Sequence, residues 1–145
     1  MYPEPKVVDF LNSNFIPVKN HIKEQPGNFE RFGAQWTPTA IVLDSGGTER
    51  HRFEGFLPVD DFLAQLELGL AKSDFANQRF DQAEKRYRHI VEAYPKAEAA
   101  PEALYWAGVS RYKATADPAP LHATFEAFQK AYTDTSWAKK ASVWA

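Results

Sequence analysis

The chain has 145 residues, of which 44% are hydrophobic and 25% are charged, enough apolar side chains for one compact domain or two small ones. Its formal net charge of −2 gives no general attraction to phosphate backbones or anionic membranes, so we expect neither nucleic acid nor a membrane as a partner. The sequence contains no cysteine, which excludes disulfides, thiolate metal sites and thiol redox chemistry by these residues.

The sequence also lacks the patterns of an exported or membrane-spanning protein. No stretch approaches the roughly 18 consecutive apolar residues of a membrane span, and MYPEPKVVDF is not laid out like a signal peptide. We therefore expect a cytoplasmic protein. One alternative stays open: if the sequence is a fragment, its missing start could have carried a targeting segment.

The first third of the chain predicts two short helices on either side of a strand. Pro3 and Pro5 mark the start of a helix whose apolar residues recur as far as Asn12-Ser13-Asn14. Phe15–Val18 is typical of a short buried strand. Phe29–Phe32 is expected to form the second helix, which stops at Gly33.

A hairpin and a long helix are predicted next. Thr39–Leu43 is a continuous apolar run, typical of a strand covered on both faces, and Asp44–Gly47 is a turn. Thr48–Glu54 is the returning strand. From Pro58 the pattern becomes helical, with an apolar stripe at helical spacing formed by Phe62, Leu63, Leu66, Leu70 and Phe75.

This order of elements, with Trp36-Thr37-Pro38-Thr39 before the second strand, resembles the thioredoxin family downstream of its redox motif, over residues 2–72. Asp44-x-Gly46-Gly47 with Arg50-x-Arg52-Phe53-x-Gly55 resembles the thioredoxin hairpin, and Tyr2-Pro3-x-Pro5-x-Val7 resembles the segment after the Cys-x-x-Cys turn. The resemblance implies a cis Thr37-Pro38 bond. It also implies that Trp36, Thr37 and Pro38 contact an extended protein or peptide client, and it calls for no cofactor.

The family's first strand and its Cys-x-x-Cys would both lie upstream of Met1. In thioredoxin-like proteins that strand lies between the strands that correspond to Phe15–Val18 and Thr39–Leu43, so the resemblance implies an empty position in the sheet. Unpaired buried backbone groups cost about 1–3 kcal/mol each, which makes an empty position unfavourable. Three outcomes stay open: the two flanking strands pair directly, another copy of the chain or another protein fills the gap, or the sequence is a truncated gene product.

The second half of the sequence contains an internal repeat. Lys96–Ala107 aligns with Asp134–Ala145 at an offset of 38 residues, and the same offset pairs Tyr87 with Phe125 and Ile90 with Phe128. The segments Phe80–Pro95 and Ala103–Tyr112 resemble the second and first helices of tetratricopeptide repeats. We expect a terminal helix over Trp137–Ala145 as a cap, and the helix from Pro58 to Phe75 as the missing layer.

The expected fold class is therefore an incomplete α/β thioredoxin-like domain over residues 1–75, followed by an all-α tetratricopeptide-like region of helical hairpins over residues 76–145. No flexible linker separates the halves between residues 68 and 83. We expect them to form one rigid unit in which the helix after Pro58 serves both cores.

Few residues are candidates for catalysis, metal binding or contact with a partner. The histidines lack metal-ligand spacing and are read as solvated or hydrogen-bonded: His21, His51, His89 and His122. The charged residues of strand Thr48–Glu54 are interpreted as a solvated face or a guarded strand edge, and those of Lys85–His89 as a solvated face. Asp60-Asp61 is interpreted as the acidic first turn of a helix. We predict no catalytic residue, metal or cofactor. Tyr105 and Tyr112 are candidate partner contacts, although core packing is favoured for Tyr112 and Trp106.

Two functions fit the sequence. One is a redox-inactive thioredoxin-like and tetratricopeptide-like module that binds proteins. The other is the downstream part of a thioredoxin-family thiol-disulfide oxidoreductase.

Overall fold

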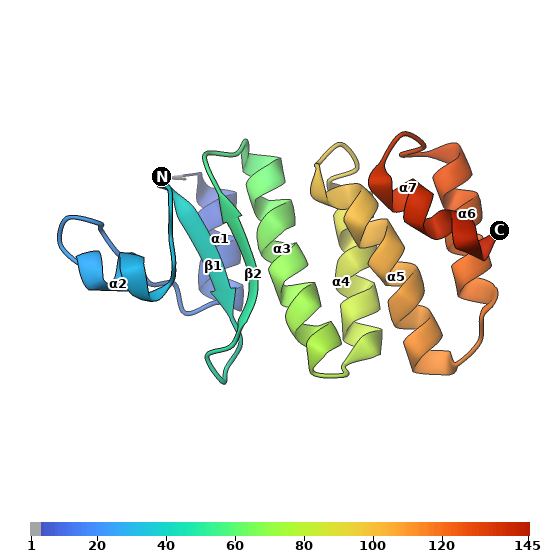
Figure 1. Cartoon of the computed structure of the whole chain (residues 1–145), viewed down its shortest axis with the longest axis horizontal. Coiled ribbons are helices and arrows are strands. Elements are labelled where there is room, and N and C mark those ends of the chain that lie inside the picture. Colours follow the sequence, from blue (N-terminus) through green and yellow to red (C-terminus); the bar gives the residue numbers. More distant parts are fainter. Residues whose placement is uncertain (1–3) are drawn as a thin grey trace.

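The computed structural model describes residues 4–145, so the expectations for Tyr2 and Pro3 lie outside the described residues. In chain order the elements are α1 (Pro5–Asn14), α2 (Pro26–Arg31), β1 (Thr39–Leu43), β2 (Glu49–Glu54), α3 (Val59–Ala76), α4 (Phe80–Ala93), α5 (Ala99–Thr115), α6 (Ala119–Lys130), α7 (Ser136–Ala141) and a 3-10 turn (Ser142–Trp144). In Figure 1, α2 lies at one end of an elongated molecule, the hairpin comes next with α3 beside it, and α4 to α7 continue beyond α3.

The hairpin forms where the apolar run Thr39–Leu43 and the turn residues after it predict it. β1 and β2 pair antiparallel, with Ala40 opposite Phe53 and Val42 opposite His51. The Asp44 carboxylate closes the turn by accepting hydrogen bonds from the Gly46 and Thr48 backbone N–H groups, each at 3.0 Å. These bonds, together with the Arg50 guanidinium, hold the pKa of Asp44 below its usual value.

The predicted strand at Phe15–Val18 is wrong. This segment is irregular, and the side chains of Ile16 and Val18 are 95% and 77% exposed. A strand is stable only when its backbone groups pair with a neighbour. Among the described residues the sheet consists of β1 and β2 alone, so direct pairing of Phe15–Val18 with β1 does not occur.

Helix α3 packs on the sheet with one face. A Cβ atom added to Gly69 would lie 2.7 Å from the Val42 Cγ2 atom, so the helix backbone runs directly against β1 there. One turn from the start of the helix, the rings of Phe62 and Phe53 meet edge to face with centroids 5.5 Å apart. The small residue at position 69 therefore sets the distance between helix and sheet.

The opposite face of α3 belongs to the helical half. Ala64, Leu68 and Ala71 are fully buried in one cluster with residues of α4 and α5. Of the predicted stripe, Leu63 and Leu66 are buried but Leu70 is only partly buried. The prediction of a single apolar stripe on this helix is wrong, because the sheet covers one face of α3 and the helices α4 and α5 cover another. The expectation that this helix serves both cores agrees with its contacts to β1, β2, α4 and α5.

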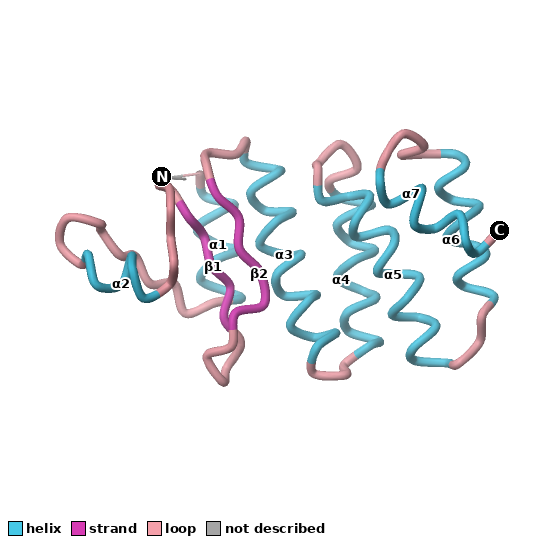
Figure 2. The backbone as a smooth tube through the Cα atoms, viewed as in Figure 1, coloured by secondary structure: helices cyan, strands magenta, loops and turns pink. Residues whose placement is uncertain are grey.

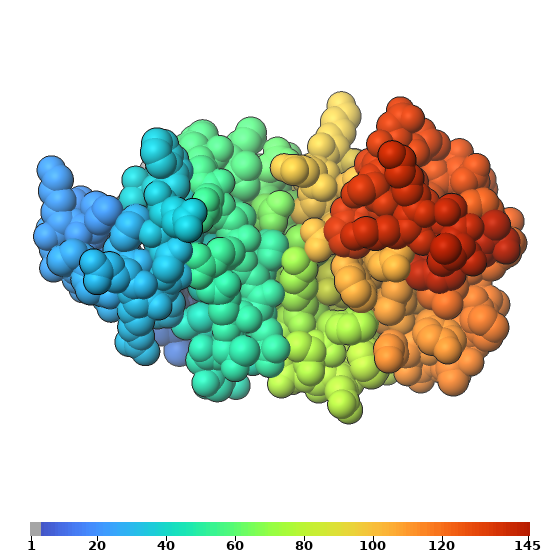
Figure 3. Space-filling view, viewed as in Figure 1, coloured from blue at the N-terminus to red at the C-terminus, as the bar shows by residue number. Residues whose placement is uncertain are grey.

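Beyond α3, successive helices run in opposite directions and pack in layers (Figures 1 and 2). The 38-residue offset pairs residues in equivalent buried places: Ile90 with Phe128, and Ala103 with Ala141, are all fully buried. A Cβ atom on Gly108 would overlap the Thr124 side chain, so α5 and α6 touch closely. On the face shown in Figure 3, α3 and α4 fill the space between the sheet and the last helices. The expected terminal helix begins at Ser136 and tightens into the 3-10 turn after Ala141.

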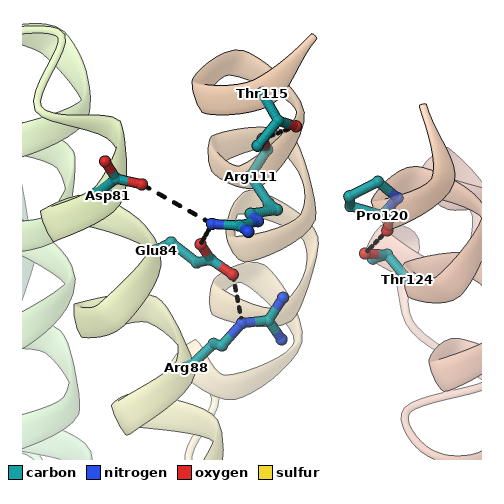
Figure 4. A network of polar contacts seen from close by, with 7 residues as sticks. All are labelled: Asp81, Glu84, Arg88, Arg111, Thr115, Pro120 and Thr124. Atoms are coloured by element: carbon teal, nitrogen blue, oxygen red, sulfur yellow. Dashed lines mark hydrogen bonds and ion pairs between the residues drawn. The ribbon is translucent and has the colours of Figure 1, made fainter. Parts of the chain in front are cut away.

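Three of the four basic residues of α4 lie on the solvated face that the sequence predicted, because Lys85, Arg88 and His89 are exposed and only Arg86 is partly buried. Arg86 pairs with the Asp74 carboxylate of α3 at 2.9 Å, and Arg88 pairs with Glu84 at 2.8 Å. Figure 4 shows Glu84 also facing Arg111 of α5, at 3.7 Å. Arg86 therefore links α4 to α3, and Glu84 links α4 to α5.

Candidate functional site

The loop before β1 holds an indole ring in solvent. Trp36 is 66% exposed, but its backbone is fixed, because the Thr39 hydroxyl donates a 2.7 Å hydrogen bond to the Trp36 carbonyl. Two residues later the Pro38 carbonyl accepts a 2.8 Å bond from the Gly55 N–H at the end of β2. A large aromatic side chain on an ordered backbone can contact a partner at a small entropic cost.

Arg52 fixes the other end of this loop. Its guanidinium reaches from β2 to the carbonyls of Phe32 and Gly33, at 2.5 and 3.3 Å, where the chain leaves α2. Its Nε atom also donates to Glu49 at 2.9 Å, and this bond lowers the pKa of the Glu49 carboxyl. Arg52 is thus a positioning residue. The sequence pattern placed it in the hairpin but carried no signal for its contact 19 and 20 residues upstream.

The Thr37-Pro38 peptide bond is cis, as the resemblance predicted. Trp36, Thr37 and Pro38 form a bend directly before β1, where the sequence placed the candidate client contacts. The turn adjoins the edge of β1 that does not face β2 (Figure 2).

The two candidate tyrosines lie elsewhere, on α5. Tyr105 is partly buried and stacks on Trp144, with ring centroids 4.6 Å apart, while Trp137 packs at 5.3 Å. Tyr112 is 38% exposed, so core packing was the wrong interpretation for it. In Figure 1, α5 lies on the far side of α3 from the sheet. The structure therefore does not bring these tyrosines together with Trp36.

His51 does not belong to a solvated face. Strand side chains alternate, so His51 and Phe53 face α3, while Arg50 and Arg52 lie on the opposite side. The His51 ring contacts Gln65 Oε1 at 2.6 Å and Lys72 Nζ at 3.2 Å. Burial lowers the pKa of His51.

The other histidines are hydrogen-bonded, as expected. His89 Nδ1 lies 2.7 Å from a carboxylate oxygen of Glu67, a buried residue on α3, and His122 Nδ1 lies 3.0 Å from the Trp144 carbonyl. The backbone N–H of Lys23 donates to His21 Nδ1 at 3.3 Å. The part of the chain that the structure describes contains no group of three or more metal-ligating side chains.

An open cleft of about 500 Å³ lies where the two halves meet, between α1, the first turn of α3 and the α4–α5 loop. Lys6 and Asp60 form a 2.7 Å ion pair across it, and Asp61 accepts a 3.2 Å hydrogen bond from the Glu98 N–H. Both carboxylates are in the first turn of α3, as predicted. Each has a partner, which favours an anchoring role over acid–base chemistry.

Comparison with known families supports the thioredoxin-like resemblance. Residues 3–70 match the family described as a thioredoxin-like domain, a segment that contains the Trp36 loop, the hairpin and most of α3. The match does not extend over the helices that follow. No curated protein and no solved structure matches the chain. Within residues 4–145, no helix has the length and apolar character needed to cross a membrane.

Proposed function

We propose that the chain is a thioredoxin-like protein-binding module with no thiol-disulfide chemistry of its own. The observation that carries this proposal is the exposed Trp36 ring on a loop fixed by Thr39, Gly55 and Arg52. The loop borders a strand edge, so an extended client segment can pair with backbone groups while its side chains pack on the indole. The absence of cysteine leaves no thiolate to attack a disulfide.

The helical half supplies a second contact surface in this proposal. Its layered helices, with Ile90 and Phe128 in equivalent buried positions, are consistent with the tetratricopeptide-like interpretation. Tyr112 exposes its ring on α5 and is the partner contact that we assign there. The Tyr105 ring packs against Trp144 and Trp137 at the C-terminal end, so it is less available to a partner than Tyr112.

Peptide binding tests the role of the loop. The probe is fluorescein-labelled, carboxymethylated insulin B chain, an unfolded segment without free thiols, and the readout is fluorescence anisotropy. Loss of a central aromatic contact weakens binding roughly tenfold or more, so we expect this loss for Trp36→Ala. Val143→Ala, an exposed apolar residue near the C-terminus, is the matched control and should bind like the wild type.

The same titration compares the two surfaces. A smaller loss is expected for Tyr112→Ala, and melting curves confirm that each variant is folded. Equal affinity of Trp36→Ala and the wild type, or no binding by the wild type at all, contradicts the proposal.

A second candidate is the downstream part of a thioredoxin-family thiol-disulfide oxidoreductase whose Cys-x-x-Cys precedes Met1. Two observations favour it: the family match that starts at residue 3, and an edge of β1 that has no neighbouring strand in the described part of the chain. In Figure 1, α1 and β1 also begin at the same end of the sheet. The nucleotide sequence upstream of the Met1 codon tests this candidate. An in-frame strand pattern that ends in Cys-x-x-Cys supports it, and an in-frame stop codon contradicts it.

A further inference from the structure

His51 of β2 contacts two side chains of α3, and their chemistry fixes where its proton lies. The Lys72 ammonium, 3.2 Å from His51 Nδ1, has hydrogens to donate and no lone pair with which to accept. Nδ1 must therefore accept, which leaves the hydrogen of the neutral ring on Nε2. Nε2 in turn donates to Gln65 Oε1 at 2.6 Å. The two contacts together hold His51 as the neutral tautomer with its hydrogen on Nε2.

Lys72 also contacts the helical half. Its Nζ atom lies 3.1 Å from a carboxylate oxygen of Glu102 on α5, and the side chains of Lys72 and Glu102 are only 29% and 21% exposed. An ammonium group has three hydrogens, so the bonds to His51 and to Glu102 form at the same time. Lys72 thus joins β2 to α5 from its position on α3.

The bond between Lys72 and His51 exists only while the ring is neutral. A protonated imidazole donates from both nitrogens, so Nδ1 would present a hydrogen and a positive charge to the ammonium 3.2 Å away. Two like charges at this distance repel each other, and more so in a partly buried place than in water. Protonation therefore breaks the contact with Lys72, whereas the bond from Nε2 to Gln65 persists.

The charges around His51 come from three elements. Lys72 of α3 opposes protonation of the ring, whereas Glu102 of α5 and Glu49 of β2 itself favour it. Strand β1 (Thr39–Leu43), which pairs with β2, contributes no titratable side chain. Burial has the largest effect and lowers the pKa of His51. The ring is therefore neutral at pH 7 and takes up a proton in mild acid.

We propose that Lys72 is a proton-sensitive latch between the hairpin and the helical half. With His51 neutral, Lys72 holds both β2 and α5; with His51 protonated, it keeps Glu102 and releases β2. Arg52, the next residue of the same strand, supports the Trp36 loop, so acid loosens the scaffold of that loop. The latch is a property of the fold and does not depend on what the loop binds.

Nitrogen chemical shifts of the histidine rings test the tautomer. Long-range ¹H–¹⁵N correlation spectra at pH 8 distinguish a ring protonated at Nε2 from one protonated at Nδ1, and the spectrum of His51→Gln identifies the signal by its loss. We expect His51 to carry its hydrogen on Nε2. A hydrogen on Nδ1 would overturn the inference, because Lys72 could not then donate to the ring.

Titration of the same signal tests the role of Lys72. Lys72→Met removes a charge that opposes protonation and a hydrogen bond that only the neutral ring accepts, so the midpoint for His51 should rise by about half a pH unit or more. Lys85→Met, which removes an exposed lysine of α4, is the matched control and should leave the midpoint unchanged. A midpoint that rises no more in Lys72→Met than in Lys85→Met overturns the inference.

Hydrogen exchange in the wild type measures whether the latch opens. Mass spectrometry at pH 7.5 and 5.0, corrected for the intrinsic effect of pH on amide exchange, compares protection in β2 with protection in α4. At the lower pH the wild type should lose more protection in β2 than in α4, and His51→Gln, which takes up no proton, should not. Equal losses in β2 and α4 of the wild type overturn the inference. No client is present, so the outcome is independent of the peptide titration with Trp36→Ala.

Discussion

Replacement of Leu68 by alanine tests whether α3 unites the two halves. Leu68 is fully buried, and its cluster includes the large side chains Tyr87 and Ile90 of α4. Such neighbours collapse little into a cavity, so we expect the free energy of unfolding to fall by about 3–4 kcal/mol, in the upper range for leucine-to-alanine changes. Leu70→Ala is the matched control two residues along, where partial burial predicts a loss of only about 1–2 kcal/mol. Urea unfolding followed by far-ultraviolet circular dichroism measures both.

The decisive result is which helices and strands lose hydrogen-exchange protection in Leu68→Ala. If α3 is common to both cores, Leu68→Ala weakens protection from hydrogen exchange in β1 and β2 as much as in α4 and α5. Hydrogen exchange with mass spectrometry in low urea separates these regions. Unchanged protection of the hairpin beside strong loss in α4 and α5 would refute the shared core. Cleavage between Lys72 and Arg79 that releases two folded fragments would refute it as well.

Three further outcomes are expected. Gly108→Ala should lower the free energy of unfolding by about 1–3 kcal/mol through overlap with Thr124, although alanine is the better helix former by about 1 kcal/mol. Gly27→Ala is the control and should cost nothing, because there is open space around Gly27. Equal melting temperatures for the two variants would contradict the close approach of α5 and α6. Burial lowers the pKa of His51, so the unfolded chain takes up this proton first and stability falls as the pH drops below about 6.5. Urea titrations at pH 7.5 and 5.5 should show a smaller fall for His51→Gln, and equal falls would exclude this group as a cause. The chain should not accelerate the reduction of insulin by dithiothreitol above the buffer rate, because it has no cysteine; acceleration by pure protein would contradict this expectation.

Much of the local structure was predictable from the sequence, because helices and turns depend on nearby residues. The stretch Pro58–Phe75 has helical periodicity, and Asp44–Gly47 has the side chains that a tight turn needs, so both were located correctly. The 38-residue offset likewise pairs Ile90 with Phe128, and both side chains are fully buried. The Trp-Thr-Pro-Thr motif placed the candidate client loop at the start of a strand. Through the family resemblance it also predicted the cis bond between Thr37 and Pro38.

The errors have another physical origin. Phe15–Val18 has the composition of a buried strand, but a strand forms only beside a partner, and its own residues cannot specify whether one is present. The free face of Tyr112 depends in the same way on which helices pack around α5.

Contacts between residues far apart in the chain could not be predicted from the sequence either. Arg52 supports the Trp36 loop through carbonyls 19 and 20 positions upstream, and Glu67 meets His89 across 22 positions. No short-range pattern encodes such pairs, because they arise only after the elements have packed. The sequence by itself therefore determined most of the helices, the hairpin and the absence of cysteine. Within residues 4–145, the tertiary structure alone decided which edge of the hairpin has no strand beside it and which side chains hold the Trp36 loop, because both depend on how the elements lie in space.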